Sequence, residues 1–299
     1  MDVTIGSWKR TCAALTSVVL VATMAGCSRR QENEAPLATP GFTPVRTRAA
    51  LGSPLEVTYK FVVAPDAKFE GNYRVFVHFL NSDEEQMWTD DHEPPRPTST
   101  WKPGETIQYT RTVFVPIYPY IGKATVRMGL YNSADGKRLP LAGGDVHQRA
   151  YTVGTLELLP QSENIFLIFK DGWHPTEVAQ DNGAVEWQWS KKVGTIAFRN
   201  PKRDVVFYLH VDGKPPFLPQ PQQVTVRIGE QVVDQFTLEG QESMIRKAAI
   251  PAATLGTGDT VELTVDAGTS FIPAQTPAAK SSDPRELGVR VFHAFVEPK

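Results

Sequence analysis

Cysteine is scarce in this chain. Of its 299 residues only Cys12 and Cys27 are cysteines, and both lie near the N-terminus. The remainder therefore cannot form disulfide bonds, thiolate metal sites or a cysteine nucleophile. A protein without these covalent links depends on buried apolar surface, and a chain of this length can supply it.

A surplus of charge of either sign is also missing. There are 31 Lys and Arg residues against 33 Asp and Glu residues, which gives a formal net charge of −2. Such a balance provides no general electrostatic attraction for nucleic acid, so we expect no nucleic-acid partner. After the N-terminal apolar run, no segment approaches the roughly twenty apolar residues that a transmembrane helix needs.

Catalytic signatures are absent as well. The sequence has no G-x-S-x-G elbow, no phosphate-binding glycine loop and no zincin helix. The paired carboxylates of a glycosidase have no local signature, and Glu177, Asp181 and Asp283 are candidates by position alone. We expect a protein that is not an enzyme, without catalytic residues or a cofactor, and a glycoside hydrolase is the least favoured class.

The N-terminus has the pattern of an export signal. Basic residues precede the apolar run 11–24, which is too short to span a bilayer comfortably. The run ends in Ala25 and Gly26, directly before Cys27. This ending resembles a bacterial lipobox, although a lipobox usually has Leu where this chain has Met24.

The lipobox resemblance implies that residues 1–26 are a lipoprotein signal peptide. It also implies that Cys27 carries a diacylglyceryl group and an N-acyl chain such as palmitate. Stable anchoring takes at least two membrane signals, and these chains meet that condition. We expect an exported protein, lipid-anchored to the cell envelope, and Ser28 favours the outer membrane in a Gram-negative cell. The alternative is an ordinary secretory signal whose cleavage site happens to precede a cysteine.

Residues 27–48 are predicted to form a lipidated, flexible tether. The segment is polar, shows no apolar period, and contains Pro36, Pro40 and Pro44 at regular intervals. Such a composition favours extended chain over packed structure.

The rest of the chain predicts an all-β fold of two tandem sandwiches. Apolar residues alternate in residues 57–63, and turn residues separate this strand from further strands, so we assign 49–160 to an immunoglobulin-like sandwich. Residues 161–299 repeat the strand-and-turn pattern, with a tight hairpin at Gly229-Glu230, and are assigned to a jelly-roll-like sandwich.

Acidic clusters raise the question of a metal site. The sequence places three acids at 83–85 and the run Asp-Asp-His-Glu at 90–93. Oxygen ligands at this density can hold Ca²⁺, but the EF-hand spacing is missing. A solvated face is the favoured interpretation, so we expect no metal.

Three tryptophans lie close together in the second half. Trp187 and Trp189 share the parity of a strand face, which favours a position in the core, whereas Trp173 follows a turn. Aromatic rings stack on the apolar faces of sugars. Trp88 and Trp101 flank a Pro-rich loop of the first domain, where they either rim a groove or cap the sandwich.

Each half contains a spaced set of residues. The first set is 76–80, 97–98, 101–105, 129–131 and 138–140, and the second is 172–177, 187–189 and 283–289. Both sets resemble those of accessory β-domains of bacterial envelope glycosyltransferases, the second of them carbohydrate-binding-like. Gln188 departs from the second pattern, which usually has Arg there, and no catalytic glycosyltransferase domain accompanies either half.

Two interpretations of the second pattern stay open. Trp173, Glu177, Asp283 and Arg285 line a ligand pocket, or Arg285 pairs with Glu177 as a structural clasp. The clasp is favoured because such a pair needs no ligand. The expected function is a non-enzymatic binding or scaffolding role in the cell envelope that recognises glycan through the second domain. The alternative is a structural subunit that binds a protein partner in a polysaccharide synthesis or export machine.

Overall fold

The computed structural model describes residues 34–180, 185–213, 217–218, 221–240 and 242–299. The predicted signal peptide, Cys27 and Asp181 lie outside these ranges. The described residues are all-β, with one four-residue helix, α1 (Ala252–Leu255), and several 3-10 turns. None of the helices in these ranges has the length and hydropathy required to cross a membrane.

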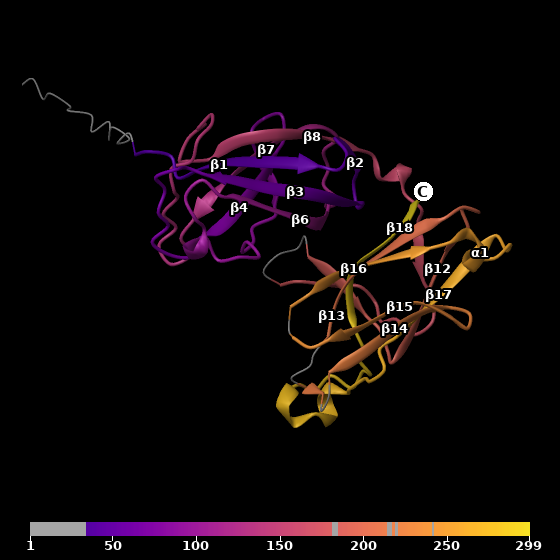
Figure 1. The fold of residues 1–299 in the computed structure, drawn as a ribbon. Coiled ribbons are helices and arrows are strands. Elements are labelled where there is room, and N and C mark those ends of the chain that lie inside the picture. The colour runs from indigo at the N-terminus through magenta and orange to yellow at the C-terminus, as the bar shows by residue number, and fades with distance from the viewer. Residues whose placement is uncertain (1–33, 181–184, 214–216, 219–220, 241) are drawn as a thin grey trace, which may run out of the picture. The chain divides into compact units, whose positions relative to one another are not determined.

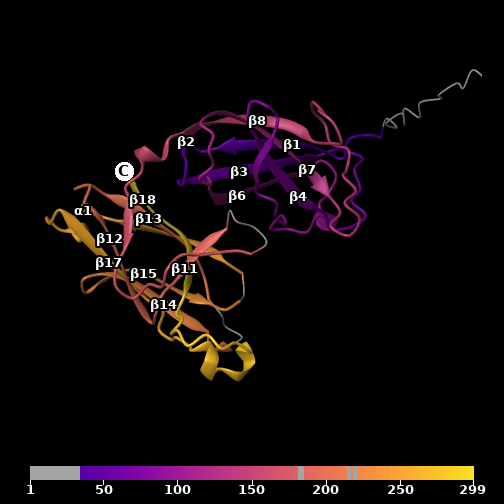
Figure 2. The ribbon, with the colours of Figure 1, turned by 180° about the vertical axis from the view of Figure 1, so that it is seen from behind.

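The first half is an immunoglobulin-like sandwich of two sheets. One sheet has the order β1-β3-β6 and the other the order β2-β8-β7-β4-β5, with β2 parallel to β8. Figure 1 shows the two layers, and Figure 2 shows them from behind. The strands are β1 (Ala38–Pro44), β2 (Arg48–Ala50), β3 (Pro54–Val63), β4 (Arg74–Leu80), β5 (Gln86–Thr89), β6 (Thr106–Phe114), β7 (Gly122–Tyr131) and β8 (Tyr151–Leu159).

The predicted alternation in residues 57–63 is confirmed. Val57, Tyr59, Phe61 and Val63 are at most 1% exposed, whereas Lys60 points to solvent. These four side chains meet inward-facing residues of the second sheet in a single core. Period-two alternation therefore positions β3 correctly from the sequence alone.

The tether predicted over 27–48 is wrong in its C-terminal part. Residues 38–44 form β1, which pairs with β3 along its whole length, and Ala38 and Phe42 enter the core. Pro40 and Pro44 are compatible with this strand because β1 lies at a sheet edge, where no second neighbour needs their N–H groups. Two of the three prolines that suggested a flexible chain, Pro40 and Pro44, are therefore part of the first sandwich.

The second half is a jelly roll. Its sheets have the orders β10-β11-β18-β13-β16 and β15-β14-β17-β12-β9. From β11 to β18, the first, eighth, third and sixth strands form one sheet and the second, seventh, fourth and fifth form the other, as in a jelly roll. The strands are β9 (Leu167–Phe169), β10 (Glu177–Val178), β11 (Glu186–Trp189), β12 (Val193–Arg199), β13 (Val205–Asp212), β14 (Gln222–Ile228), β15 (Gln231–Leu238), β16 (Met244–Ile250), β17 (Thr260–Asp266) and β18 (Arg290–Pro298).

Local sequence explains most of this sandwich. The expected hairpin connects β14 and β15 through Gly229 and Glu230, and Gly229 has the positive φ of 55° that such a turn requires. Strand β16 was not predicted, because Arg246 and Lys247 interrupt its apolar alternation. The two sheets enclose a second core, separate from the first.

Candidate functional site

The structure brings together three of the four residues predicted for a ligand site. Arg285 donates from Nη1 to Oε1 of Glu177 at 2.6 Å, and from Nη2 to Oδ2 of Asp283 at 2.7 Å. Its Nε contacts both oxygens of Asp283 at 3.0 Å. Glu177 belongs to edge strand β10, and Arg285 precedes the last strand, so the group joins two distant segments.

The chemistry of this group is that of a clasp. The pKa of Asp283 is lowered, chiefly by the hydrogen bond from Arg285, so its carboxyl group is not suited to donate a proton. The same contacts raise the pKa of Arg285. Since one guanidinium occupies both carboxylates, the ion pairs are satisfied without a ligand. Ligand binding by these residues stays a prediction.

Trp173 contacts other parts of the second sandwich. Its indole N–H donates to the backbone oxygen of Thr195 at 2.9 Å, and its ring packs edge-on against Phe169 at 4.8 Å. A Cβ at Gly194 would lie 2.6 Å from the indole, so the ring rests directly on the backbone of β12. These contacts are sufficient to explain the residue as part of the packing.

The predicted core position of Trp189 is confirmed. Trp189 is 6% exposed and packs in a small cluster with Phe271 and Leu287, while Trp187 covers the edge of that cluster. The guanidinium of Arg290 lies 4.9 Å from the ring of Trp187. A cation at this distance from an indole face is stabilised by the ring quadrupole.

The two acidic clusters have protein partners. Asn81 accepts hydrogen bonds from the backbone N–H groups of Asp83 and Glu85, which forms a turn, and Glu84 pairs with Arg127. Across the residues that the structure describes, no group of three or more His, Cys, Asp or Glu is placed to hold a metal.

Asp90 forms the centre of a polar network at the edge of the first core. Its carboxylate accepts from Tyr59 at 2.8 Å and from Nε and Nη2 of Arg111 at 3.2 and 2.8 Å. His92 contacts the backbone oxygen of Asp90 and the hydroxyl of Tyr109, each at 2.7 Å. Burial lowers the pKa of His92 and raises that of Tyr59. Networks satisfied in this way hold their members in fixed positions.

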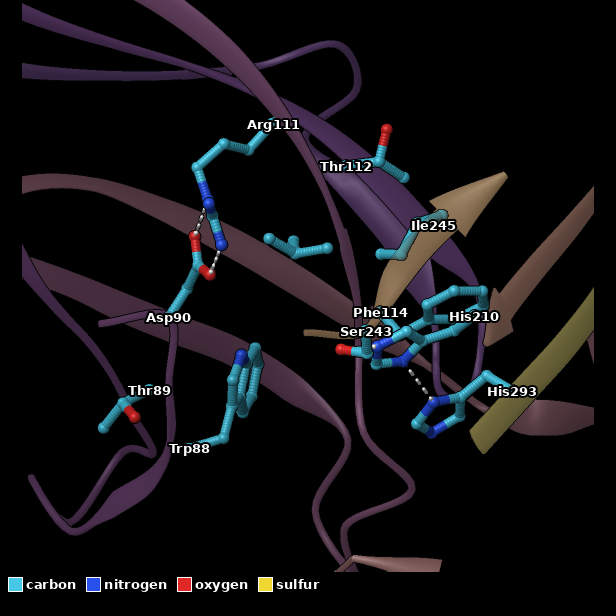
Figure 3. A pocket seen from close by; sticks show the side chains of 11 residues that line it. Trp88, Thr89, Asp90, Arg111, Thr112, Phe114, His210, Ser243, Ile245 and His293 are labelled. Atoms are coloured by element: carbon cyan, nitrogen blue, oxygen red, sulfur yellow. Dashed lines mark hydrogen bonds and ion pairs between the residues drawn. The ribbon is translucent and has the colours of Figure 1, made fainter. Parts of the chain in front are cut away.

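Asp90 and Arg111 of this network form one end of a cavity of about 480 Å³, which we call the Trp88–His293 cavity. Figure 3 shows its lining side chains, with the Asp90–Arg111 and His210–His293 contacts dashed. The lining residues are Trp88, Thr89 and Asp90, then Arg111, Thr112, Val113 and Phe114, and finally His210, Ser243, Ile245 and His293.

Aromatic rings from β5 and β6 line the cavity. The indole of Trp88 stacks on Phe79 with 4.3 Å between ring centroids and 8° between planes, so one of its faces is held by the core. The ring of Phe114 stacks on His293 at 4.8 Å. Both aromatic rings are thus fixed by neighbouring rings before any ligand binds.

Two histidines contribute hydrogen-bonding groups. The Nδ1 atoms of His210 and His293 are 3.4 Å apart, and Nε2 of His210 is 2.8 Å from the hydroxyl oxygen of Ser243. Burial, with a smaller effect of His293, lowers the pKa of His210 to about 4, and burial also lowers the pKa of His293. Both rings are therefore neutral at pH 7, and each presents a donor and an acceptor.

The sequence left open whether Trp88 and Trp101 rim a groove or cap the sandwich. Trp88 lines the cavity, whereas Trp101 is buried in the first core. Sequence reasoning missed Arg111, Phe114, His210 and His293. Strands β13 and β18 place the two histidines directly opposite each other, although 83 positions separate them in the chain. Strand alternation indicates which face each residue occupies, but only the pairing register brings these two together.

Comparison with protein-family models gives no match, and comparison with curated proteins gives none either. Among solved structures, the C-terminal domain of wzt has 11% identity and a TM-score of 0.32, over 42% of this chain and 75% of that chain.

A tandem carbohydrate-binding pair, CBM22-1-CBM22-2 of Xyn10C from Paenibacillus barcinonensis, has 10% identity and a TM-score of 0.28, over 87% of this chain and 94% of that chain. The DNA glycosylase AlkC of Pseudomonas fluorescens has 12% identity and a TM-score of 0.27, over 41% of this chain and 30% of that chain. Similarities of this size carry no argument about function.

Proposed function

We propose that the protein is a non-enzymatic lipoprotein of the cell envelope that binds a segment of glycan in the Trp88–His293 cavity. The observation that supports this function is an aromatic face beside fixed hydrogen-bonding groups. Trp88 offers the flat apolar surface that matches the C–H face of a pyranose. The volume of about 480 Å³ lies within the roughly 300–1,000 Å³ usual for small-ligand sites.

The polar groups of the cavity suit sugar hydroxyls. Arg111 uses Nε and Nη2 for Asp90, and Nη1 has no partner among the described residues. That nitrogen can donate to a hydroxyl or ring oxygen. Both ring nitrogens of His210 have protein partners, whereas Nε2 of His293 has none among the described residues and can face a sugar hydroxyl. The hydroxyl of Ser243 can both donate and accept.

The same contacts favour binding over catalysis. The carboxylate of Asp90 already accepts three hydrogen bonds, and Glu177 and Asp283 share the guanidinium of Arg285. A glycosidase needs one carboxyl group free to donate a proton and another to act as base or nucleophile. We therefore assign no catalytic residue. The glycan is expected to bind in this cavity and not at the group of Trp173, Glu177, Asp283 and Arg285.

Tryptophan fluorescence, titrated with surface polysaccharides of the producing organism, tests the proposal. A saturable change is expected for the purified full-length protein. Ile245→Trp should abolish the binding by filling the cavity, and Ser243→Ala should weaken it; their affinities are measured by calorimetry.

Trp173→Phe serves as the control, since Trp173 is not among the cavity residues, and it should leave the affinity unchanged. Circular dichroism checks that each variant is folded. No binding by any polysaccharide, or equal affinity for the folded Ile245→Trp variant, would contradict the proposal.

A protein partner is the second candidate function, supported by edge strand β9. Ile168 on this strand is 62% exposed, and Phe166, directly before the strand, is 66% exposed. Val193 of the adjacent β12 is 43% exposed. An apolar sheet edge can take up a strand from another chain. Ile168→Lys should abolish co-purification of one defined envelope protein, whereas Ile245→Trp should not affect it.

A further inference from the structure

A second cavity, of about 430 Å³, lies on the outer face of the five-stranded sheet of the first sandwich. In β7 the side chains of Ala124 and Val126 enter the core, so Lys123, Thr125 and Arg127 lie on the opposite face. We call this the Arg127 cavity. Its lining residues are Leu80, Asn81, Ser82 and Glu84, then Tyr120, Lys123, Thr125 and Arg127, and finally Val146 and Thr152.

The guanidinium of Arg127 has few hydrogen-bond partners for a side chain that is mostly buried. Only 15% of its side chain is exposed, and its Nη2 donates to Glu84 at 2.9 Å. Its Nε is buried and has no hydrogen-bond partner among the described residues. A guanidinium has five N–H donors, and a buried cation is costly unless it is paired and hydrogen-bonded.

Glu84 is a weak partner for this cation. Its side chain is 72% exposed, and its backbone has a φ of 64°, a left-handed conformation that costs energy for a residue other than glycine. Because the carboxylate of Glu84 stays largely in water, solvent screening weakens its attraction to Arg127. An incoming anion can therefore replace Glu84 at Arg127 at low cost.

A second cation lies on the same face. Lys123 lines the cavity, and its ammonium forms no ion pair among the described residues. Glu157, which lies opposite Lys123 on β8, pairs with Arg48 at 3.1 Å. Around the two cations, Ser82, Thr125 and Thr152 provide hydroxyl groups.

We infer that the Arg127 cavity binds the carboxylate of an acidic sugar, a uronate residue of a saccharide, with Arg127 and Lys123 as its charge partners. The planar fork of Arg127 matches a carboxylate, and the hydroxyl groups match the sugar. The inference does not rest on the function proposed for the Trp88–His293 cavity, because the two cavities share no lining residue.

Calorimetric titration of the full-length protein with galacturonate oligomers, neutral galactose oligomers and inorganic phosphate tests the inference. Galacturonate oligomers should bind at least about tenfold more tightly than the neutral oligomers, since a charge-assisted hydrogen bond contributes roughly that factor. Binding should also weaken as salt is added. Equal affinity for the charged and neutral oligomers, or binding of phosphate without galacturonate, would overturn the inference.

The variants change the affinity in opposite directions. Arg127→Lys and Lys123→Ala should each weaken galacturonate binding, by about tenfold for Arg127→Lys, which loses the bidentate fork. Glu84→Gln should strengthen it several-fold, because it removes the internal competitor. An unchanged or lower affinity for Glu84→Gln would overturn the assignment, even if Arg127→Lys proved unstable.

Two control variants test whether galacturonate binds at Arg127 and not elsewhere on the protein. Lys60→Ala removes an exposed lysine from β3, in the other sheet of the same sandwich, and should have no effect. Ile245→Trp, which fills the Trp88–His293 cavity, should leave galacturonate binding intact. A loss of galacturonate binding in either control would contradict binding at Arg127, whereas failure of the glycan titration alone affects only the proposed function.

Discussion

His210 and His293 face each other across neighbouring strands, with their Nδ1 atoms 3.4 Å apart and their rings nearly parallel at 4°. One ring must donate and the other accept, so the contact is lost when both rings are protonated. Protonation of both would place two positive charges side by side in a partly buried position.

Stability should therefore fall in mild acid. The pKa of His210 is about 4, below the ordinary value of 6.5, so the unfolded chain binds more protons between these values. The contribution of His210 to the free energy of unfolding is complete above about pH 6.5. It falls by about 1–3 kcal/mol as the pH is lowered towards 4. Urea unfolding across this range should show a shallower pH dependence for His210→Asn than for His147→Asn, an exposed control. Equal slopes in the two variants would show that His210 does not titrate as described.

The clasp between Glu177 and Arg285 should contribute modestly to stability. Their side chains are 32% and 33% exposed, so their coupling should lie between that of a surface pair and that of a buried pair, at about 0.5–1.5 kcal/mol. A double-mutant cycle with Glu177→Gln and Arg285→Gln measures this coupling by denaturant unfolding. The exposed pair Lys170–Glu262 provides the comparison, and its coupling should be smaller. If the two cycles agree, the clasp is no stronger than an ordinary surface contact.

Gly172→Ala should be strongly destabilising. Gly172 has a φ of 80°, and an added Cβ would lie 2.0 Å from the backbone oxygen of Val193, which cannot move without disturbing β12. We expect a loss of about 2–4 kcal/mol from strain and steric overlap together. Gly136→Ala separates the two effects, since Gly136 has a φ of 72° and open space around it, and it should cost about 1 kcal/mol. Thermal unfolding of both variants measures how much of the cost comes from the steric overlap, and equal costs would contradict a steric contribution at Gly172.

Cys27→Ser tests the lipid anchor proposed from the sequence. The wild-type protein should sediment with membranes and gain the mass of its acyl chains, because two or more buried chains give stable anchoring. The variant should lose that mass and appear in the soluble fraction. Unchanged sedimentation and mass in the variant would favour an ordinary secretory signal.

The strands of both sandwiches follow closely from the sequence where alternation is regular. Tyr59 and Phe61 alternate with polar residues, and both are fully buried. The clasp was also predictable, because it needs only Arg285 and Glu177 on segments that meet. Strand β1 was not, since a sheet edge tolerates prolines that elsewhere mark a flexible chain. The cavities depend on strand register and loop paths, which no local pattern specifies.

Because β1 begins early in the chain, the folded protein cannot lie far from Cys27. With the first strand beginning at Ala38, ten residues, 28–37, separate Cys27 from the folded protein. Fully extended, such a segment spans about 35 Å at most. If Cys27 is lipidated, this short segment holds the first sandwich close to the bilayer surface. It would then meet glycans close to their membrane-proximal ends, not the distal ends of long surface chains.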